Sequence, residues 1–557
     1  AGVSYIFANF GSDHPGLLEA IAEARAKGRP VPAVITSPNE FVAISAAQGF
    51  AQVSGAPQAV FVHVDCGTQA LGGGIHNAAK GRTPMLVFAG ASPYTQAGEM
   101  RGSRSEFIQW IQDVHDQRGI VRGYMKYDNE LRTGRNIKQM VHRALQIARS
   151  DPRGPVYLMG AREVMEEELS EEVAIDPAQW RPIEPAALPA DGVERIVEAF
   201  ARARRPLVVT SYLGRNMDAV GELVRFCEAT GAGVLESVPS AMNFPHDHPL
   251  YQGNQWNEPR QNEALAQADC ILVIDSDVPW IPVISRPADG AAIFHIDVDP
   301  LKDDMPLWYI QARHAFRADA ATALRQLNDA LAGYGLESAT VADRRRHYEE
   351  AGTERRQALE ALEEPQAGVI TPEYLCACVR RHVDDDTIVL NEGITNYPTI
   401  ANHMRMSRPG SMLASGAGSL GWNGGAAIGA KMAAPDKTVV AMTGDGSYMF
   451  SIPSTVHWMA KKYGTPFLQI VFNNRGWKAP RFSALSVHPD GYASRANDLD
   501  LSFDPPPDYS GIAAAAGGAF ALKVERAEDL EAAVAEGFDQ VRNHGRAAVL
   551  DVWLAQL

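Results

Sequence analysis

The chain contains 557 residues, of which 46% are hydrophobic and 21% are charged. This composition supplies several buried cores, and it excludes a disordered chain or a small scaffold that depends on disulfides. The 51 basic residues are outnumbered by 67 acidic ones, which gives a net charge of −16. Because a chain with this charge repels phosphate groups, we expect no nucleic acid and no membrane among its partners.

The cysteines and the first residues indicate the compartment. The chain has five cysteines, an odd and sparse set, which favours reduced thiols and a cytoplasmic location. No apolar run approaches the roughly 20 residues that a membrane span needs. The first residues lack the basic segment of a signal peptide and are typical of a strand that enters a turn.

Three blocks of the sequence alternate short aliphatic runs with longer helical patterns, which is typical of βαβ units. We therefore predict an α/β protein with three doubly wound domains and parallel sheets, over residues 1–165, 190–345 and 368–557. The charged stretch 341–364 predicts an exposed helix with a solvated face. The expected strands are 4–9, 32–36, 59–64, 85–90, 156–160, 206–211, 233–237, 270–276, 292–299, 387–393, 411–415, 438–447, 467–474 and 547–553.

The most informative motif lies in the third block. Gly444-Asp445-Gly446-Ser447 ends one expected strand, and 26 residues (447–472) separate its GDG from Asn473-Asn474-Arg475-Gly476-Trp477. Because one strand–helix–strand unit returns the chain to the same edge of a sheet, Asp445 and Asn474 are predicted to lie side by side. Their oxygens suit Mg²⁺ or Ca²⁺, and the glycines suit a diphosphate. GDG alone also occurs in ordinary tight turns, so the prediction depends on the whole combination.

This combination resembles the signature of enzymes that use thiamine diphosphate (ThDP), in particular the acetolactate synthase and benzoylformate decarboxylase group. The resemblance covers essentially the whole chain and implies pyrimidine-binding, middle and diphosphate-binding domains, in that order. It implies a ThDP cofactor and an Mg²⁺ ion held by Asp445, Asn474 and the carbonyl oxygen of Gly476. The diphosphate would then contact Gly444, Gly446 and Ser447.

The first block carries a second matching element, PAVITSPNEFVAISAAQGFA. The family has a glutamate in the helix after the second strand, and the resemblance assigns this role to Glu40. Its carboxyl group would hydrogen-bond the aminopyrimidine ring and so promote loss of a proton from the cofactor. The alternative is a surface glutamate at a helix start, a position where acids are common.

Two further elements resemble parts of the family's cofactor site. In SGAGSLGWNGG, Leu420 falls where the family has a bulky apolar residue beneath the cofactor, and core packing is the alternative. In IVLNEGITNY, the resemblance implies that Thr395 binds the diphosphate. Glu392 would lie near the aminopyrimidine or would cap a helix.

Fewer residues indicate the substrate. Alignment with benzoylformate decarboxylase-like members places His63 on a catalytic histidine and Ser12 on a substrate-binding serine. A histidine suits proton transfer near neutral pH, although histidines at strand ends are also structural. Asp13 departs from the family pattern, and so do Asp65 and Cys66.

The resemblance implies a ThDP- and Mg²⁺-dependent enzyme, a lyase or carboligase that cleaves or forms a C–C bond on a small 2-oxo acid or 2-hydroxy ketone (acyloin). The alternatives are an acetolactate synthase-like or flavin-dependent oxidase relative, a catalytically silent ThDP-binding subunit, and a protein that binds another diphosphate. We find no flavin fingerprint and expect no FAD. We expect a homodimer or homotetramer, because the family builds each site from two subunits, with Glu40 and Asp445 on different chains.

Overall fold

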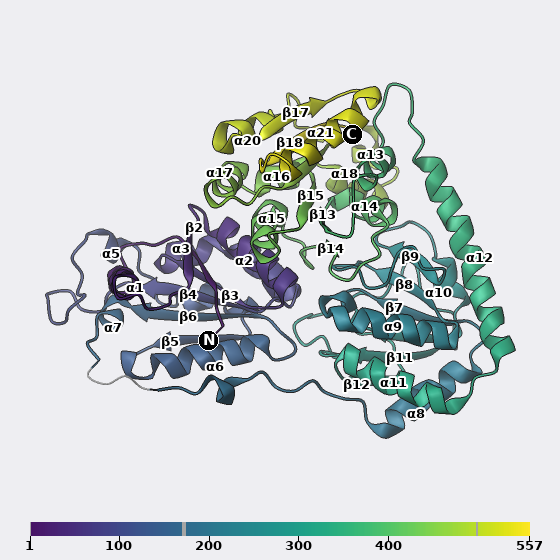
Figure 1. The fold of residues 1–557 in the computed structure, drawn as a ribbon, viewed down its shortest axis with the longest axis horizontal. Helices are drawn as coiled ribbons and strands as arrows, with labels where there is room; N and C mark the ends of the chain where they lie inside the picture. Colours follow the sequence, from purple (N-terminus) through teal and green to yellow (C-terminus); the bar gives the residue numbers. More distant parts are fainter. Residues whose placement is uncertain (1, 170–173, 497–498, 557) are drawn as a thin grey trace.

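The structure is a computed structural model that describes residues 2–169, 174–496 and 499–556. Residues 1 and 557, the outer limits of the predicted domains, lie outside this described part. Three six-stranded parallel sheets, each flanked by helices, make up the molecule (Figure 1). The predicted α/β fold class is confirmed. Within the described chain, no helix combines the length and the apolar character that crossing a bilayer requires.

The first sheet has the strand order β2-β1-β3-β4-β6-β5. Its strands are β1 (Tyr5–Ala8), β2 (Ala33–Thr36), β3 (Gln58–Val62), β4 (Met85–Ala91), β5 (Tyr127–Leu131) and β6 (Pro155–Ala161). The helices of this part are α1 (Pro15–Ala26), α2 (Glu40–Ser54), α3 (Val64–Ala70), α4 (Gly72–Lys80), α5 (Ile108–Ile111), α6 (Ile137–Arg149) and α7 (Arg162–Met165). Strand β4 is buried at every position, which explains its continuous apolar run.

The middle sheet has the strand order β12-β11-β10-β7-β8-β9. Its strands are β7 (Pro206–Thr210), β8 (Gly233–Ser237), β9 (Tyr251–Gln255), β10 (Cys270–Ile274), β11 (Ala292–Asp297) and β12 (His314–Arg317). Its helices are α8 (Ala190–Arg202), α9 (Met217–Thr230), α10 (Glu263–Gln267), α11 (Ala320–Tyr334) and α12 (Ser338–Leu362).

Helix α12 corrects one expectation. The charged stretch is helical as predicted, but one side of the helix is buried against the middle sheet. Arg344 is only 1% exposed, and its guanidinium donates to the carbonyl oxygens of Thr230 (2.8 Å) and Ala201 (3.0 Å). Because these carbonyl groups satisfy the guanidinium, a basic residue in the sequence pattern does not mark a solvated position here.

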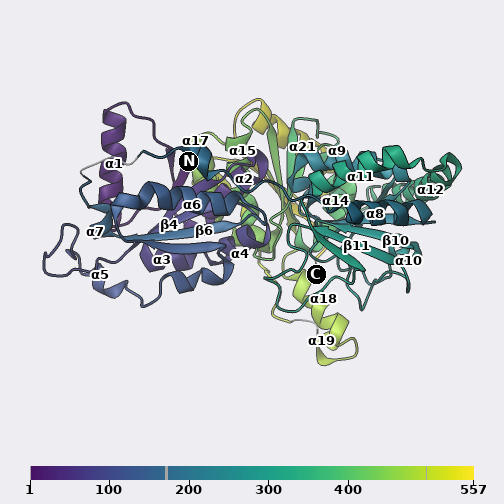
Figure 2. The ribbon, with the colours of Figure 1, turned by 90° about the horizontal axis from the view of Figure 1, so that it is seen from below.

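The third sheet has the strand order β14-β13-β15-β16-β18-β17. Its strands are β13 (Thr387–Glu392), β14 (Met412–Leu413), β15 (Thr438–Gly444), β16 (Leu468–Asn473), β17 (Phe520–Val524) and β18 (Ala548–Trp553). Its helices are α13 (Pro372–Arg380), α14 (Tyr397–Met404), α15 (Trp422–Ala433), α16 (Asp445–Phe450), α17 (Pro453–Tyr463), α18 (Lys478–Val487), α19 (Tyr492–Arg495), α20 (Tyr509–Gly517) and α21 (Ala527–Arg542). Figure 2 shows α18 and α19 projecting from the body of the molecule.

Helices α2 and α15 join the first part of the molecule to the third. Their backbones approach so closely that a Cβ on Gly429 would lie 1.9 Å from the carbonyl oxygen of Ala46. A Cβ on Gly49 would likewise lie 2.2 Å from the carbonyl oxygen of Ala426. The small residues in both helices therefore permit a contact that larger side chains would prevent.

Each sheet has a central point where the strand order reverses. These switch points lie between β1 and β3, between β7 and β10, and between β13 and β15. Loops that leave neighbouring strands in opposite directions create a crevice at the carboxyl edge, which is where α/β proteins bind ligands. The predicted site residues follow strands of the first and third sheets, at these edges.

Charged side chains fill the switch point of the middle sheet. Lys302 Nζ lies 2.7 Å from Asp297 Oδ2 and 2.8 Å from Asp277 Oδ1. Arg82, which follows α4, donates two hydrogen bonds of 2.7 and 2.8 Å to the Asp277 carboxylate. Acids and bases thus neutralise one another across the boundary between the first and middle parts.

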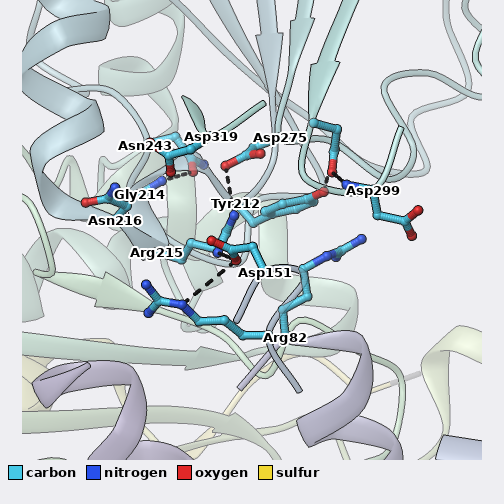
Figure 3. A network of polar contacts seen from close by, with 12 residues as sticks. Arg82, Asp151, Tyr212, Gly214, Arg215, Asn216, Asn243, Asp275, Asp299 and Asp319 are labelled. Carbon is cyan, nitrogen blue, oxygen red and sulfur yellow. Dashed lines mark hydrogen bonds and ion pairs between the residues drawn. The ribbon is translucent and has the colours of Figure 1, made fainter. Parts of the chain in front are cut away.

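Two further arginine contacts extend this network, and Figure 3 shows how the side chains converge. The guanidinium of Arg82 lies 4.3 Å from the ring centre of Tyr212, close enough for a cation–π contact. Arg215 forms an ion pair of 3.1 Å with Asp151, which lies between α6 and β6. The middle sheet is therefore tied to the first part by charges and an aromatic ring.

Candidate active site

Glu40 is the first residue of α2 and lies at the carboxyl edge of the first sheet. Asn39 caps this helix, because its side-chain oxygen accepts the backbone N–H groups of Phe41 (2.9 Å) and Val42 (3.3 Å). The Nδ2 atom of Asn9, just after β1, donates to Glu40 Oε1 at 2.7 Å. A capped helix and a side-chain donor thus fix the predicted catalytic carboxyl group.

His63 follows β3 and is held at both ring nitrogens. Its Nδ1 atom lies 2.5 Å from Asp13 Oδ1, and its Nε2 atom lies 2.9 Å from Nε2 and 3.1 Å from Oε1 of Gln112. The hydrogen bond to Asp13 raises the pKa of His63 above its ordinary value, against the effect of burial. Burial alone would raise the pKa of Asp13. Hydrogen bonds and charges from His14 and His63 outweigh burial and hold this pKa far below its usual range.

Ser12 lies beside this pair in the sequence and has an unsatisfied hydroxyl group. Its Oγ atom is buried and has no hydrogen-bond partner within the described chain. The backbone carbonyl oxygen of Ser12 accepts a hydrogen bond of 3.3 Å from the guanidinium of Arg162. The backbone is therefore anchored, and the hydroxyl group is available to a ligand.

Asp445 lies at the carboxyl edge of the third sheet, where β15 and β16 pair in parallel register. It is 3% exposed, and its oxygens accept the N–H groups of Gly446 (2.8 Å) and Gly476 (3.1 Å). The second of these bonds brings the GDG segment and the segment after the Asn pair together, as the sequence spacing predicts. Burial raises the pKa of Asp445 to about 6, because the N–H groups only partly replace the lost water.

The same edge carries unsatisfied polar atoms. Ser447 Oγ and Asn474 Oδ1 are buried without a hydrogen-bond partner in the described chain. Gly444 faces the end of β13, because a Cβ there would lie 3.9 Å from the carbonyl oxygen of Gly393. Gly446 must lack a side chain, since a Cβ would lie 2.3 Å from the ring of Trp477. A hydroxyl, an amide oxygen and bare backbone therefore border one polar cradle.

Glu392 caps a helix, which is one of the two roles considered for it. Its carboxylate accepts the N–H groups of Gly421 (2.7 Å), Trp422 (3.1 Å) and Asn423 (2.8 Å), so it caps α15. Burial raises the pKa of Glu392 to about 8, with these N–H groups acting in the opposite direction. Leu420 is partly buried just before this cap.

Unusual backbone conformations mark both edges. Positive φ angles occur at Val64 (38°), next to His63, at Ile394 (56°), next to Thr395, and at Arg475 (62°), next to Asn474. A left-handed conformation is costly for β-branched residues, and such strain concentrates at functional sites. Thr395 itself is partly buried in the short turn that follows β13.

Three residues that contact the predicted side chains carried no assigned role in the sequence. Asn9 binds Glu40, whereas Asp13 and Gln112 bind His63. Asp13 carried one signal, because it departs from the pattern of the resembling family. Asn9 and Gln112 lie in loops without a recognisable motif, and only the fold brings them to these partners.

Three sequence models of thiamine pyrophosphate (ThDP) enzymes match the chain: the N-terminal TPP binding domain at residues 1–120, the central domain at 193–327 and the C-terminal TPP binding domain at 393–552. The chain belongs to the thiamine pyrophosphate enzyme family. It is therefore a ThDP-dependent enzyme, as the sequence predicts.

Individual members of the thiamine pyrophosphate enzyme family resemble most or all of the chain. The chain is 26% identical to benzoylformate decarboxylase of Pseudomonas aeruginosa, over 96% of this chain and 93% of the relative. It is 23% identical to the acetolactate synthase large subunit of Lactococcus lactis, over 82% of this chain and 76% of the relative. The solved ThDP-dependent 4-hydroxybenzoylformate decarboxylase of Rhodococcus jostii RHA1 has the same fold, with a TM-score of 0.77 at 22% identity and coverage of 100% and 96% of the two chains.

The donor set at the third sheet fits a metal-bound diphosphate. Asp445 is a buried carboxylate, and the free Asn474 Oδ1 adds a second hard oxygen ligand. Ser447 Oγ adds a hydroxyl donor at the start of α16. A cation at this place would supply the positive charge that burial of Asp445 demands.

Proposed function

We propose that this ThDP-dependent enzyme cleaves or forms a C–C bond next to the carbonyl group of a small 2-oxo acid or acyloin. Its similarity to benzoylformate decarboxylase and to an acetolactate synthase subunit supports this class of substrate. Decarboxylation and acetolactate synthase-like carboligation differ in what captures the acyl group, so both belong to the proposal. Retention of Glu40 with a dedicated donor, Asn9, argues against a catalytically silent subunit.

One observation carries the proposal: two polar edges each contain a buried oxygen that no group in the described part of the chain satisfies. Ser12 Oγ lies at the first sheet, whereas Ser447 Oγ and Asn474 Oδ1 lie at the third. Because buried polar atoms are nearly always hydrogen-bonded, both edges favour a polar ligand. The first edge also offers proton-transfer groups, and the third offers ligands for a cation and a diphosphate.

We assign Mg²⁺ to the Asp445 carboxylate, Asn474 Oδ1 and the carbonyl oxygen of Gly476. Hard oxygen ligands of this kind suit Mg²⁺, which keeps phosphate and water in its remaining positions. The start of α16 directs backbone N–H groups toward the same place, which favours an anion. The residues proposed to hold ThDP are Thr395, Leu420, Gly444, Asp445, Gly446, Ser447, Asn474 and Gly476.

The side chains at the first sheet have separate tasks. Bound ThDP supplies a carbon nucleophile for the substrate carbonyl and an acceptor for the electrons of the broken bond. Glu40 holds a proton at its carboxyl group against the cofactor ring. His63 gives and takes a proton at Nε2, and Ser12 Oγ orients the polar end of the substrate.

The first test replaces Glu40 with Gln. We expect kcat to fall by about 10²-fold or more, because the amide cannot transfer a proton, while ThDP affinity is retained. Steady-state kinetics and calorimetric titration with ThDP and Mg²⁺ measure the two quantities. Glu19→Gln, on the exposed side of α1, is the matched control and should behave as wild type. Unchanged turnover in Glu40→Gln would refute the assignment.

The substrate class is tested with the wild-type protein loaded with ThDP and Mg²⁺. Mass spectrometry would follow 2-oxo acids and acyloins, each with and without an aldehyde acceptor. We expect loss of CO₂ or an aldehyde from at least one compound, and a longer acyloin when an acceptor is present. If ThDP binds but no compound is converted, the silent-subunit alternative replaces the proposal.

We further infer that the chain forms a homodimer or homotetramer whose sites combine Glu40 of one chain with Asp445 of another. Exposed apolar residues directly after the diphosphate segment support this inference: Met449 is 41% exposed and Phe450 is 54% exposed. Side chains of this kind favour coverage by a partner. Sedimentation velocity should show at least a dimer, and a monomer that is fully active would contradict the shared site.

We also propose a cytoplasmic location. All five cysteines are free thiols, and four of them are buried. Free thiols persist in reducing compartments, whereas oxidising compartments favour disulfides. Fractionation of the source cells would test this, with the protein expected alongside cytoplasmic markers.

A further inference from the structure

We propose that Asp13 is a positioning residue for His63: it fixes the ring orientation and keeps a proton on Nδ1, while Gln112 holds Nε2. The inference rests on the proposed role of His63 in proton transfer and adds two residues to it. Asp13 takes over no role from the residues assigned to the cofactor. We expect it to affect the reaction only through the position and protonation of His63.

The contacts of Asp13 make it a dedicated partner. The side chain is 2% exposed, and Oδ1 lies 2.5 Å from His63 Nδ1. The other oxygen, Oδ2, accepts the backbone N–H of Val64 at 3.1 Å. Because one carboxylate binds both the ring of His63 and the residue that follows it, the ring cannot turn without losing a charge-assisted hydrogen bond.

Two glycines make room for this pair. A Cβ on Gly11 would lie 1.9 Å from His63 Nδ1, and a Cβ on Gly90 would lie 1.8 Å from Asp13 Oδ2. Gly90 belongs to β4 and Gly11 to the loop after β1, so two separate segments accommodate the contact. The absence of a side chain at both positions therefore permits this close approach. A side chain at Gly11 would displace His63, and one at Gly90 would displace Asp13.

The backbone beside His63 supplies a third observation. Val64 has a φ of 38°, which is rare and strained for a β-branched residue. Its N–H group is the one that Asp13 Oδ2 accepts. The carboxylate thus also stabilises the strained turn that presents His63.

Gln112 suits both protonation states of the ring. Its amide nitrogen and oxygen lie 2.9 and 3.1 Å from His63 Nε2. With the Nδ1 proton held by Asp13, a neutral ring accepts from the amide NH₂ group, and a charged ring donates to the amide oxygen. Gln112 can therefore bind Nε2 in either protonation state, and a substrate that exchanges a proton with Nε2 takes the place of this amide.

The charges around His63 determine whether its pKa rises or falls when Asp13 is removed. Asp13 and, more weakly, Asp65 raise the pKa of His63, and burial opposes them. His14 Nδ1 lies 2.9 Å from the same Asp13 oxygen and competes for it. Since Asp13 is the strongest positive contribution, its removal should lower the pKa of His63 and free the Nδ1 position.

The test compares Asp13→Asn with wild type by NMR of the full-length holoenzyme with labelled histidine. The His63 signals are assigned from their loss in His63→Gln. We expect the pKa of His63 to fall in Asp13→Asn, with a shift of the neutral ring toward the Nε2–H tautomer. Asp13→Glu should restore the titration in part, and Asp65→Asn should give a smaller shift because it removes charge without the hydrogen bond.

Kinetics separate a positioning role from a purely structural one. In Asp13→Asn we expect kcat to fall about 10²-fold with little change in KM, and the His63 limb of the pH profile to move to lower pH. If Asp13→Asn does not fold, Asp13→Glu gives the same comparison. A folded variant with an unchanged His63 titration and tautomer would overturn the inference. If the wild type converts no substrate, the proposed function fails, whereas the NMR result still decides whether Asp13 controls the ring.

Discussion

The carboxyl edges of the middle and third sheets are built alike and charged differently. At the third sheet, Asp445 is 3% exposed, and in the described chain no basic side chain forms an ion pair with it. At the middle sheet, Asp297 is fully buried, but Lys302, itself 1% exposed, lies 2.7 Å away. Asp445 is therefore buried without a counter-charge from the described chain, whereas Asp297 has one in Lys302.

The pKa values of the two acids express this difference. Burial raises the pKa of Asp445 to about 6. Burial acts in the same direction on Asp297, but the nearby His295 ring and the charges of Lys302 and Arg82 hold its pKa far below the usual range. A buried acid without a counter-charge favours a cation from outside, whereas a neutralised one stabilises the fold. The comparison therefore contrasts the proposed ligand site around Asp445 with the Asp297–Lys302 ion pair on the same kind of sheet edge.

The largest expected effect follows from removing the compensation at the middle edge. Lys302→Ala leaves Asp297 buried beside the Tyr212 hydroxyl without its cation, so we expect the free energy of unfolding to fall by about 3–5 kcal/mol. Urea denaturation measures this loss. The double variant Lys302→Met/Asp297→Leu should recover most of it, because no charge is then left unpaired. A loss below about 1 kcal/mol in Lys302→Ala would break the comparison.

The matching change at the third edge should act on binding instead. Asp445→Ala removes the proposed cation ligand, so we expect ThDP affinity in the presence of Mg²⁺ to fall by about 10²-fold or more. Calorimetric titration with ThDP in the presence of Mg²⁺ measures this affinity. Asp277→Ala, in the middle network, is the matched control and should leave ThDP affinity unchanged. Equal affinity in Asp445→Ala and wild type would contradict the metal assignment.

A smaller effect concerns pH in the absence of ThDP and Mg²⁺. Because the pKa of folded Asp445 is raised from 3.8 to about 6, its contribution to stability is present below pH 3.8 and is lost as the pH rises through 6. The unfolding free energy of wild type relative to Asp445→Asn should therefore fall by about 2–3 kcal/mol over this range. Urea denaturation at several pH values measures the difference. Saturating Mg²⁺ and ThDP should abolish the fall, and a constant difference without them would refute the raised pKa.

The sequence predicted the central strands of all three sheets but not most of the edges. The four strands that it missed, β5, β9, β12 and β17, each lie at the edge of a sheet. Strands β5 (YDNEL) and β9 (YQGNQ) lack the apolar run that reveals a strand covered on both faces. An edge strand has one free side, and polar or charged residues there discourage pairing with other chains.

The residues of the candidate site were likewise predictable only in part. Asp445 and Asn474 were predictable because one strand–helix–strand unit links them, so spacing alone places them at one edge. The partners of His63 were not, because Gln112 is 49 residues away and reaches the ring from a loop after α5. Asp13 is 50 residues away and lies after a different strand. Contacts of this kind depend on strand order, which one sequence does not specify.

The smallest expected effect is an absence: purified protein should carry no flavin. A dinucleotide would bind the middle sheet at its switch point, between β7 and β10. Tyr212 follows β7 and Asp277 follows β10, and both belong to the network that Arg82 and Lys302 complete. A diphosphate that displaced these side chains would separate their ion pairs, which costs several kcal/mol per uncompensated charge.

The visible absorbance spectrum of the purified protein, followed by denaturation and chromatography of any released chromophore, tests this expectation. We expect no flavin absorbance in wild type, and none in Lys302→Met, because that variant still leaves Arg82 and Asp277 paired across the crevice. Stoichiometric FAD in the wild type would show that the network opens for a ligand. The carboxyl edges of the middle and third sheets would then both bind ligands. The charge balance of a buried acid would no longer distinguish a binding edge from a structural one.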